Sequence, residues 1–247
     1  MNGVVAGDRP PRWRGSRTRL IIAAVVTPCL VVVIAVVVGI NRGPAQPMRV
    51  LPLGDSITDG WRYVPGGYRI RLWERLVQAD HDKIDFVGSL HNGPPELGEP
   101  DHEGHSGWRI DQLSANIDGW MGTYQPDAVL LHIGTNDVLQ DYQLATAPAR
   151  LEHLVGRICI DRPGVQVAVA SIVPRPKMEA QVDAYNAAIP ALVDRARAGG
   201  CAATFVDMNA ALTEADIDES ATHPTRAGYD KMADAWYPVV QAMYDRL

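Results

Sequence analysis

The sequence predicts a three-layer α/β/α sandwich around a mostly parallel five-stranded sheet, preceded by a transmembrane helix. Short apolar runs of strand length alternate five times with stretches of helical periodicity, which is typical of a parallel sheet with helices on both faces. One run, residues 128–133, is apolar along nearly its whole length, as in a strand buried on both faces. A stretch of 21 residues without a charge, residues 20–40, predicts the membrane helix.

Each element follows from its apolar pattern. The strands are short apolar runs, and the helices show apolar residues three or four positions apart. Between the second strand and the second helix, residues 88–108 are rich in glycine, proline and histidine and are expected to form a loop. The expected strands are residues 49–53, 84–87, 128–133, 165–173 and 203–206, and the expected helices are centred on residues 68–77, 110–120, 144–158, 182–193 and 229–240.

Residues 20–40 are long enough to cross a bilayer, about 30 Å at roughly 1.5 Å per residue. They exceed the apolar region of a cleaved signal peptide, and residues 41–47 offer no clean cleavage site. The five arginines of residues 1–19 should stay in the cytoplasm. We therefore expect a basic cytoplasmic tail (1–19), a single-pass membrane anchor (20–40), a linker (41–48) and an extracytoplasmic domain (49–247). A cleaved signal, the alternative, predicts a secreted domain.

Composition and charge exclude several classes of protein. With 47% hydrophobic and 21% charged residues, the chain is not a disordered polyelectrolyte. The whole chain carries −6 and residues 1–19 carry +4, so residues 41–247 carry −10. Because nucleic-acid binding needs a basic face, we expect no nucleic-acid partner.

Two cysteines of the domain, Cys159 and Cys201, could pair in an oxidising compartment. Spacing alone does not show that their Cα atoms come within bridging range. Two separately buried thiols therefore remain an open alternative.

Four polar segments follow predicted strands. Because the carboxyl ends of parallel strands meet at one edge of a sheet, we expect these segments to converge there. They are GDSIT at residues 54–58, EGHSGW at 103–108, GTND at 134–137 and THP at 222–224.

These segments hold the groups that ester hydrolysis needs: a nucleophile, a base and donors for an oxyanion. Ser56 is the candidate nucleophile, at a tight turn where Gly54 is expected to permit unusual backbone angles. His223 is the candidate base, since its ordinary pKa of about 6.5 suits proton transfer near neutrality. Asn136 offers a side-chain donor and Gly107 a backbone N–H. Taken singly, each segment also fits an ordinary turn or helix cap.

With these four blocks in this order, residues 49–247 resemble the SGNH hydrolases, also called GDSL esterases and lipases. The resemblance implies a flavodoxin-like fold, Ser56 as nucleophile, His223 as base, and an oxyanion hole built from the Ser56 N–H, the Gly107 N–H and the Asn136 side chain. The stretch HEGHSGWRIDQL is most similar to the carbohydrate esterase group that includes acetyl xylan esterases. That similarity implies removal of small acyl groups, acetyl above all, from carbohydrate.

The chain departs from the family at one position. The family usually has Asp three residues before the histidine, where this chain has Ser220. Glu219, Asp218, Ser220 or a backbone carbonyl could orient the imidazole instead. We favour the carbonyl or Ser220 over Glu219, because an acid four residues back must bend differently from one three back.

His102, Glu103 and His105 invite a metal-site interpretation. Their spacing lacks the i, i+4 helical pattern of zinc hydrolases, so we expect neither a metal nor a cofactor and assign them to a sugar-binding loop. The aromatic residues near the blocks could stack on a saccharide ring or belong to the core; they are Trp61, Tyr63, Tyr68 and Trp108.

The leading hypothesis is therefore a serine esterase that acts on an acyl ester or an acetylated polysaccharide, with a monomeric catalytic domain held to the membrane by its N-terminal helix. Asp55 and Asp137 are expected to hold loops rather than to react. Two alternatives remain: a short-chain lipase or thioesterase on the same fold, and a catalytically silent domain that binds cell-surface polysaccharide.

Overall fold

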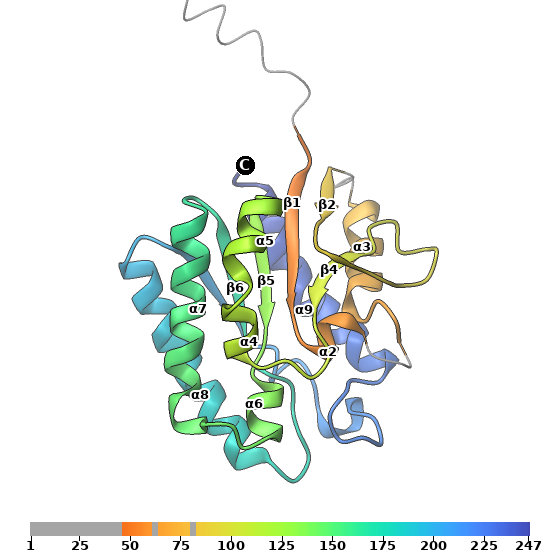
Figure 1. Ribbon diagram of the computed structural model, residues 1–247. Helices are drawn as coiled ribbons and strands as arrows, with labels where there is room; N and C mark the ends of the chain where they lie inside the picture. The colour runs from red at the N-terminus through yellow and green to blue at the C-terminus, as the bar shows by residue number, and fades with distance from the viewer. Residues whose placement is uncertain (1–45, 61–63, 80–82) are drawn as a thin grey trace, which may run out of the picture. The chain divides into compact units, whose positions relative to one another are not determined.

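The computed structural model describes residues 46–60, 64–79 and 83–247 (Figure 1). The predicted tail, the membrane segment and most of the linker lie outside these residues. Within the described part of the chain, no helix combines the length and the apolar character needed to cross a bilayer. Residues 47–247 pack together as one unit.

The sandwich predicted for residues 49–247 is confirmed. The sheet runs in the order β3-β4-β1-β5-β6-β7, and β2 also pairs with β1. All strand pairs are parallel except β3 with β4, which is antiparallel. The strands are β1 (Met48–Gly54), β2 (Ile84–Phe86), β3 (Leu90–His91), β4 (Asp101–Gly104), β5 (Ala128–His132), β6 (Gln166–Ala170) and β7 (Ala202–Val206).

The predicted number of five strands was wrong, because the described residues form seven. Both additional strands, β3 and β4, lie within residues 88–108, which were expected to form a loop. The sequence of β4 is Asp-His-Glu-Gly, and His102 and Glu103 are fully buried there. A strand whose buried side chains are polar has no apolar period, so its pattern resembles that of a loop.

β2 and β4 share one side of β1. β2 pairs with the start of β1, through Met48 to Val50, and β4 pairs with its end, at Leu53 and Gly54. The carbonyl of Val50 accepts a hydrogen bond from Val87 on that side. Pro52, two residues further along, faces the same side, in the gap between the two partners. A proline has no N–H to donate to a neighbouring strand. Because Pro52 lies in the gap between β2 and β4, no ladder hydrogen bond is lost, and this central strand tolerates the proline.

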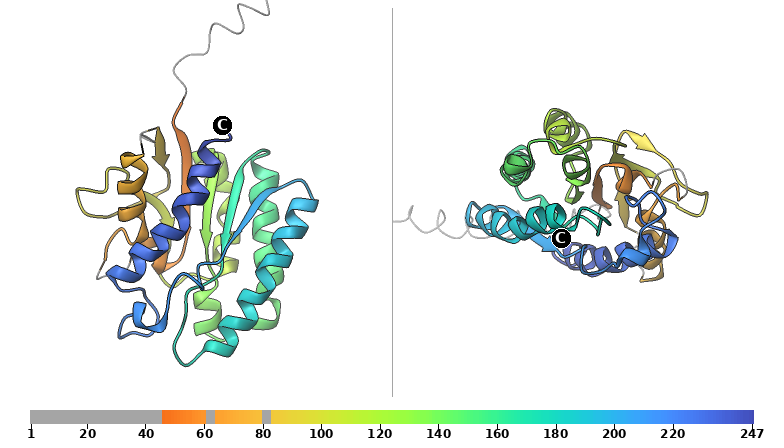
Figure 2. Two further views of the ribbon diagram at one scale, coloured as in Figure 1. Left: turned by 180° about the vertical axis from the view of Figure 1, so that it is seen from behind. Right: turned by 90° about the horizontal axis from the view of Figure 1, so that it is seen from below.

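Helices cover both faces of the sheet. α3 (Tyr68–Gln78) and α9 (Arg226–Tyr244) lie together on one face, as Figure 2 shows from behind. The other face carries α4 (Ile110–Ser114), α5 (Ile117–Tyr124), α7 (Ala147–Asp161) and α8 (Glu179–Ala198). The short helical segments are α2 (Ser56–Asp59), α6 (Thr135–Leu139), η1 (Leu144–Thr146) and η2 (Glu214–Asp216).

The residues expected to form one helix at 110–120 form two, α4 and α5. The break falls at Ala115 and Asn116, and Asn116 is the N-cap of α5. Nδ2 of Asn116 donates to the carbonyl of Gln112, in the last turn of α4. The apolar spacing thus continues across residues 115 and 116, although the helix is interrupted there.

Two apolar cores fill the spaces between the sheet and its helices. The core under α3 and α9 contains Trp236 and Tyr68, which are fully buried with ring centroids 6.0 Å apart. Tyr68 is therefore a core residue. Of the two roles considered for it, it has the packing role and does not stack on a saccharide ring. The second core lies between the opposite face of the sheet and α4, α5, α7 and α8.

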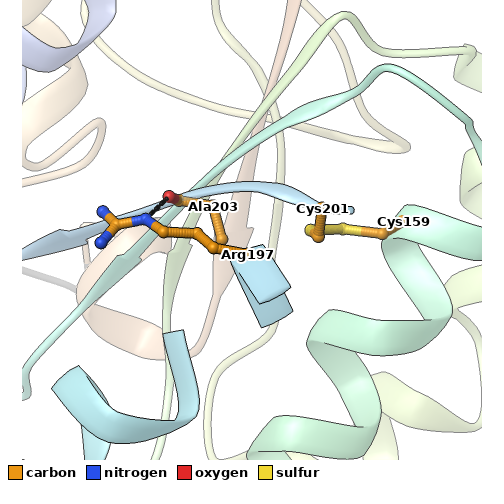
Figure 3. Close-up of a disulfide and its surroundings, with 4 residues drawn as sticks. All are labelled: Cys159, Arg197, Cys201 and Ala203. Atoms are coloured by element: carbon orange, nitrogen blue, oxygen red, sulfur yellow. Dashed lines mark hydrogen bonds between the residues drawn. A yellow bond between two sulfur atoms is a disulfide. The ribbon is translucent and has the colours of Figure 1, made fainter. Parts of the chain in front are cut away.

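Cys159 and Cys201 form a disulfide, with their Cα atoms 5.7 Å apart (Figure 3). Cys159 lies near the end of α7, and Cys201 directly precedes β7. In the same region, Nε of Arg197 donates to the carbonyl of Ala203 at 2.6 Å. The disulfide thus joins a covering helix to the edge strand, and the alternative of two free thiols was wrong.

Candidate active site

Three of the four polar segments begin where neighbouring strands end. Gly54, the last residue of β1, pairs with Gly104 of β4 on one side and with His132 of β5 on the other. α2 and α6 start within three residues of these strand ends, at the lower edge of the sheet in Figure 1. The topology therefore brings the segments to one edge, as expected for a parallel sheet.

Ser56 is the first residue of α2. Asp55 caps this helix, because its Oδ1 accepts a hydrogen bond from the N–H of Ile57 at 2.9 Å. A Cβ at Gly54 would overlap the carbonyl oxygen of His132 and the hydroxyl of Thr58. The backbone of Gly54 is outside the left-handed region. The prediction of unusual angles there was wrong: glycine is needed for the close approach of β1, β5 and α2.

Two buried carboxylates hold the loops around Ser56. Burial raises the pKa of Asp55 to about 7, against the opposing effect of the hydrogen bond from Ile57. Asp137 accepts from the N–H of Ile110 at 3.1 Å and from Nη1 of Arg150 at 2.5 Å. Asp137 therefore ties the GTND segment to the starts of α4 and α7.

His223 lies against Ser56. Its Nε2 is 2.9 Å from Oγ of Ser56, although 167 positions separate the two residues. Partial burial is the largest influence on the His223 pKa, which lies below its ordinary value; Asp218 acts to raise it and Arg175 to lower it. A neutral imidazole within hydrogen-bond distance of a serine hydroxyl can accept its proton.

The loop that carries His223 is fixed from two directions. The carbonyl of His223 accepts a hydrogen bond from the N–H of Asp218 at 2.8 Å, and Ile217 forms an isolated β-bridge with Pro224. From the loop before α8, Nη1 of Arg175 donates to the carbonyl of Ala221 at 2.8 Å and also to the hydroxyl of Thr222. The base is thus held by a closed turn and by a guanidinium.

Of the candidates for orienting the imidazole, the structure brings Ser220 to the ring. Oγ of Ser220 lies 3.2 Å from Nδ1 of His223, and the same hydroxyl hydrogen-bonds Oδ1 of Asp218. Glu219, between them in sequence, is exposed.

The expected oxyanion donors lie on two segments that contact each other. Gly107 is exposed with a φ of +81°, and no atom lies within 4 Å of where a Cβ would be. This opening leaves its backbone accessible to a substrate. Nδ2 of Asn136, at the start of α6, donates to the carbonyl of Trp108 at 2.9 Å. An amide group has two N–H donors, so one remains for a ligand.

The loop with Gly107 is held by His105, a role that sequence reasoning missed. The imidazole stacks on the rings of Trp108 and Trp120, with centroids 4.1 and 5.0 Å away, and the two indole rings also contact each other at 6.2 Å. Its Nε2 lies 2.7 Å from Oε2 of Glu103, which also accepts from Ser89. This contact assigns Trp108 to the loop's own packing. A stack between residues 15 positions apart leaves no local signal in the sequence.

The residues weighed as metal ligands make other contacts. Nδ1 of His102 accepts from the N–H of Gly104 at 2.9 Å, and burial lowers the His102 pKa to about 2. In the part of the chain that the structure describes, no three His, Cys, Asp or Glu side chains are grouped to hold a metal ion. Trp61 and Tyr63, weighed as sugar-stacking residues, lie outside the described residues.

Arg69, on the buried side of α3, was also missed. Its guanidinium donates to the carbonyls of Thr58, Asp59 and Pro100, and to both the carbonyl and the side chain of Asn92. Burial lowers its pKa to about 10. Arg69 therefore joins the end of α2 to the β3–β4 hairpin. Nothing in its local sequence distinguishes it from the half-buried Arg71, which pairs with Asp234 at the surface.

Comparison with known proteins gives the site a family context. A Clostridium thermocellum family 3 carbohydrate esterase is 36% identical, and the superposition covers 81% of this chain and 98% of that structure with a TM-score of 0.74. The structure of an acetyl esterase mutant with acetate ion is 28% identical, with 81% and 100% covered and a TM-score of 0.73. A multidomain esterase of Ruminococcus flavefaciens is 25% identical over 228 residues, 80% of this chain.

The chain spans only part of the curated relatives that it matches. It covers 29% of the multidomain esterase and 56% of a second relative, from Acetivibrio thermocellus, which is 33% identical over 130 residues. Residues 53–231, which include all four polar segments, match the family described as GDSL-like lipase/acylhydrolase. This match extends over more than half of the chain, and the chain therefore belongs to the GDSL-like lipase/acylhydrolase family.

Proposed function

We propose that this protein is a serine esterase that removes small acyl groups, acetyl above all, from carbohydrate. The observation that carries the proposal is the 2.9 Å hydrogen bond between Oγ of Ser56 and Nε2 of His223 at the carboxyl edge of the sheet. A serine hydroxyl paired with a neutral imidazole is the arrangement that activates serine as a nucleophile.

In this mechanism, Oγ of Ser56 attacks the ester carbonyl while Nε2 of His223 takes the hydroxyl proton. The developing oxyanion accepts hydrogen bonds from Asn136, from the N–H of Gly107 and from the N–H of Ser56. The C–O bond to the sugar then breaks, and the imidazolium gives its proton to the leaving alcohol oxygen. Water, deprotonated by the same imidazole, then attacks the acyl-serine; the bond between the acyl carbon and Oγ of Ser56 breaks, the imidazolium returns its proton to Oγ, and the carboxylic acid leaves.

The choice of acetyl esters of carbohydrate is supported by the relatives. Those that cover this domain almost end to end are named as a family 3 carbohydrate esterase and an acetyl esterase. The exposed Gly107 also leaves the oxyanion donors open to a bulky leaving group. A short-chain lipase or thioesterase would use the same Ser56 and His223; the ester series below separates the lipase from an acetyl esterase.

The test combines an active-site probe with substrates of graded length. A fluorophosphonate should label the full-length chain on Ser56, and S56A should abolish both labelling and hydrolysis. Among p-nitrophenyl esters, kcat/KM should be highest for acetate and fall with acyl length. Acetylated xylan and acetylated cell-wall glycans should release acetate.

Each competing hypothesis predicts a different result. A folded chain that binds polysaccharide but neither reacts with the probe nor hydrolyses any ester would be a silent binding domain. A preference for butyrate or longer esters would instead indicate a short-chain lipase.

We also propose that the domain acts outside the cytoplasm, anchored by residues 20–40. The apolar stretch with five arginines before it supports this topology, and the Cys159–Cys201 disulfide is typical of oxidising compartments. Protease added to intact cells should digest the domain, and the chain should stay in the membrane fraction at full length. A mature protein in the medium that begins after residue 40 would favour a cleaved signal.

A further inference from the structure

The turn before His223 places three side chains in series. Oγ of Ser220 lies 3.2 Å from Nδ1 of His223, and the same hydroxyl hydrogen-bonds Oδ1 of Asp218. The backbone N–H of Ser220 donates to that carboxylate oxygen as well, at 3.0 Å. Asp218 therefore reaches the imidazole through one intervening hydroxyl, while Ser56 contacts Nε2, the other ring nitrogen.

The chemistry of these groups determines where each proton lies. A carboxylate only accepts hydrogen bonds, so Asp218 accepts the proton of the Ser220 hydroxyl. A hydroxyl carries one proton, so Ser220 has none to give to His223 and accepts from Nδ1–H instead. A neutral imidazole protonated at Nδ1 keeps its lone pair on Nε2, which is the nitrogen that faces Ser56.

We propose that Asp218 and Ser220 form an orienting chain in which the carboxylate fixes the hydroxyl and the hydroxyl holds His223 in the tautomer that can accept the Ser56 proton. Both are positioning residues, because they act through His223. The inference rests on the proposed esterase function and adds no covalent step to it. Serine at position 220 thus moves the orienting carboxylate one hydrogen bond further away instead of removing it.

Backbone hydrogen bonds hold the turn that carries the orienting chain, and they do not depend on the Asp218 side chain. The N–H of Asp218 donates to the carbonyl of His223 at 2.8 Å, and the N–H of Ala221 donates to the carbonyl of Asp218 at 2.9 Å. Ala221 takes a left-handed conformation, with a φ of +56°, that lets the turn close. Arg175 holds the carbonyl of Ala221 from outside the turn. Variants at Asp218 and Ser220 are therefore expected to fold.

Two substitutions interrupt the orienting chain in different ways. S220A removes the hydroxyl. D218A removes the carboxylate, so the hydroxyl proton is no longer fixed and can turn to Nδ1 and select the tautomer with Nε2 protonated. Both should lower kcat with p-nitrophenyl acetate by about 10- to 10³-fold, less than the roughly 10⁴-fold cost of replacing a directly bound triad aspartate. KM should change little, since the tautomer matters chiefly in the transition state.

Three further variants separate this role from a general effect on the loop. S220T keeps a hydroxyl and should retain most of the wild-type kcat. E219Q removes a neighbouring exposed carboxylate from the same turn and should be close to wild type. The double variant S220A/D218A should be no slower than the slower single variant, because both substitutions interrupt the same orienting chain.

Different results overturn the two proposals. If S220A and D218A both stay within about twofold of wild type while S56A and H223A are inactive, the orienting-chain proposal is wrong and the esterase mechanism stands. If E219Q loses as much kcat as D218A, the loss comes from the charge of the loop and the orienting-chain proposal is again wrong. If the folded wild-type chain neither hydrolyses esters nor reacts with a fluorophosphonate, the esterase proposal fails and the orienting chain fails with it.

Discussion

At the scale of single residues, the proposed chemistry depends on the protonation of His223. Its pKa lies below the ordinary value because partial burial penalises the charged imidazolium, and the cation of Arg175 acts in the same direction, whereas Asp218 opposes both. The base must be neutral to accept a proton from Ser56. Activity is therefore expected to rise with pH through the His223 pKa, below about 6.5, and to be lost in acid.

Replacing Arg175 with glutamine should move this acidic limb to higher pH. The sign follows from the charge: without the guanidinium, the imidazolium is less disfavoured, so its pKa rises and the base stays protonated to a higher pH. The kcat/KM profile between pH 4 and 9 measures the midpoint. R195Q, which removes an exposed arginine paired with Glu152 on the surface, serves as the control and should leave it unchanged. A midpoint that moves to lower pH in R175Q would contradict the assignment.

Asn136 should contribute to the transition state rather than to substrate binding. N136A is expected to lower kcat by about 10²- to 10³-fold, the usual cost of one lost oxyanion donor, with little change in KM. Steady-state kinetics on p-nitrophenyl acetate measure both constants. N186A is the matched control, because Asn186 bonds the backbone of Ile172 and not the proposed donors. A rise in KM without a fall in kcat would assign Asn136 to ground-state binding.

At the scale of elements, the sequence predicts those strands, helices and loops whose residues form a local apolar or polar pattern. The central strands appear as apolar runs and the covering helices as apolar spacings, and the four polar segments follow from their position after strands. β4 leaves no such pattern, since its buried residues His102 and Glu103 are polar; Glu103 accepts hydrogen bonds from Ser89, and Nδ1 of His102 accepts one from the N–H of Gly104. The roles of Arg69 and His105 were missed for the same reason, because their partners are distant in sequence.

Arg69 illustrates how one such contact can support an element. Its guanidinium donates hydrogen bonds to carbonyls at the end of α2 and in the β3–β4 hairpin. R69M should lower the free energy of unfolding by about 3 kcal/mol or more, because each buried carbonyl left without a donor costs about 1–3 kcal/mol. Urea denaturation followed by circular dichroism measures the loss. R71M removes a surface ion pair with Asp234 from the same helix and should cost no more than about 1 kcal/mol; equal losses in the two variants would refute a special role for Arg69.

At the scale of the whole molecule, the fold and the catalytic edge are predictable because both follow from the order of strands in a parallel sheet. The pairing of His223 with Ser56 across 167 positions follows from that order together with the family resemblance. The contact of Ser220 with the ring depends on the exact path of a short turn, which no periodicity encodes. The disulfide is also not encoded locally: two cysteines show that a bridge is possible, and only the fold, which brings their Cα atoms to 5.7 Å, shows that it forms.

The Cys159–Cys201 disulfide should stabilise the folded domain without contributing to catalysis. It closes a loop across 42 positions of sequence, and a loop of that length restricts the unfolded chain enough for a stabilisation of about 2–4 kcal/mol. The double variant C159S/C201S should therefore unfold at lower urea concentration than the oxidised wild type, by that difference in free energy, with kcat unchanged at 25 °C. Dithiothreitol should shift the wild type toward the variant and leave the variant's own transition in place. Equal urea transitions for oxidised wild type and variant would mean that the bridge only joins two elements already held by their packing.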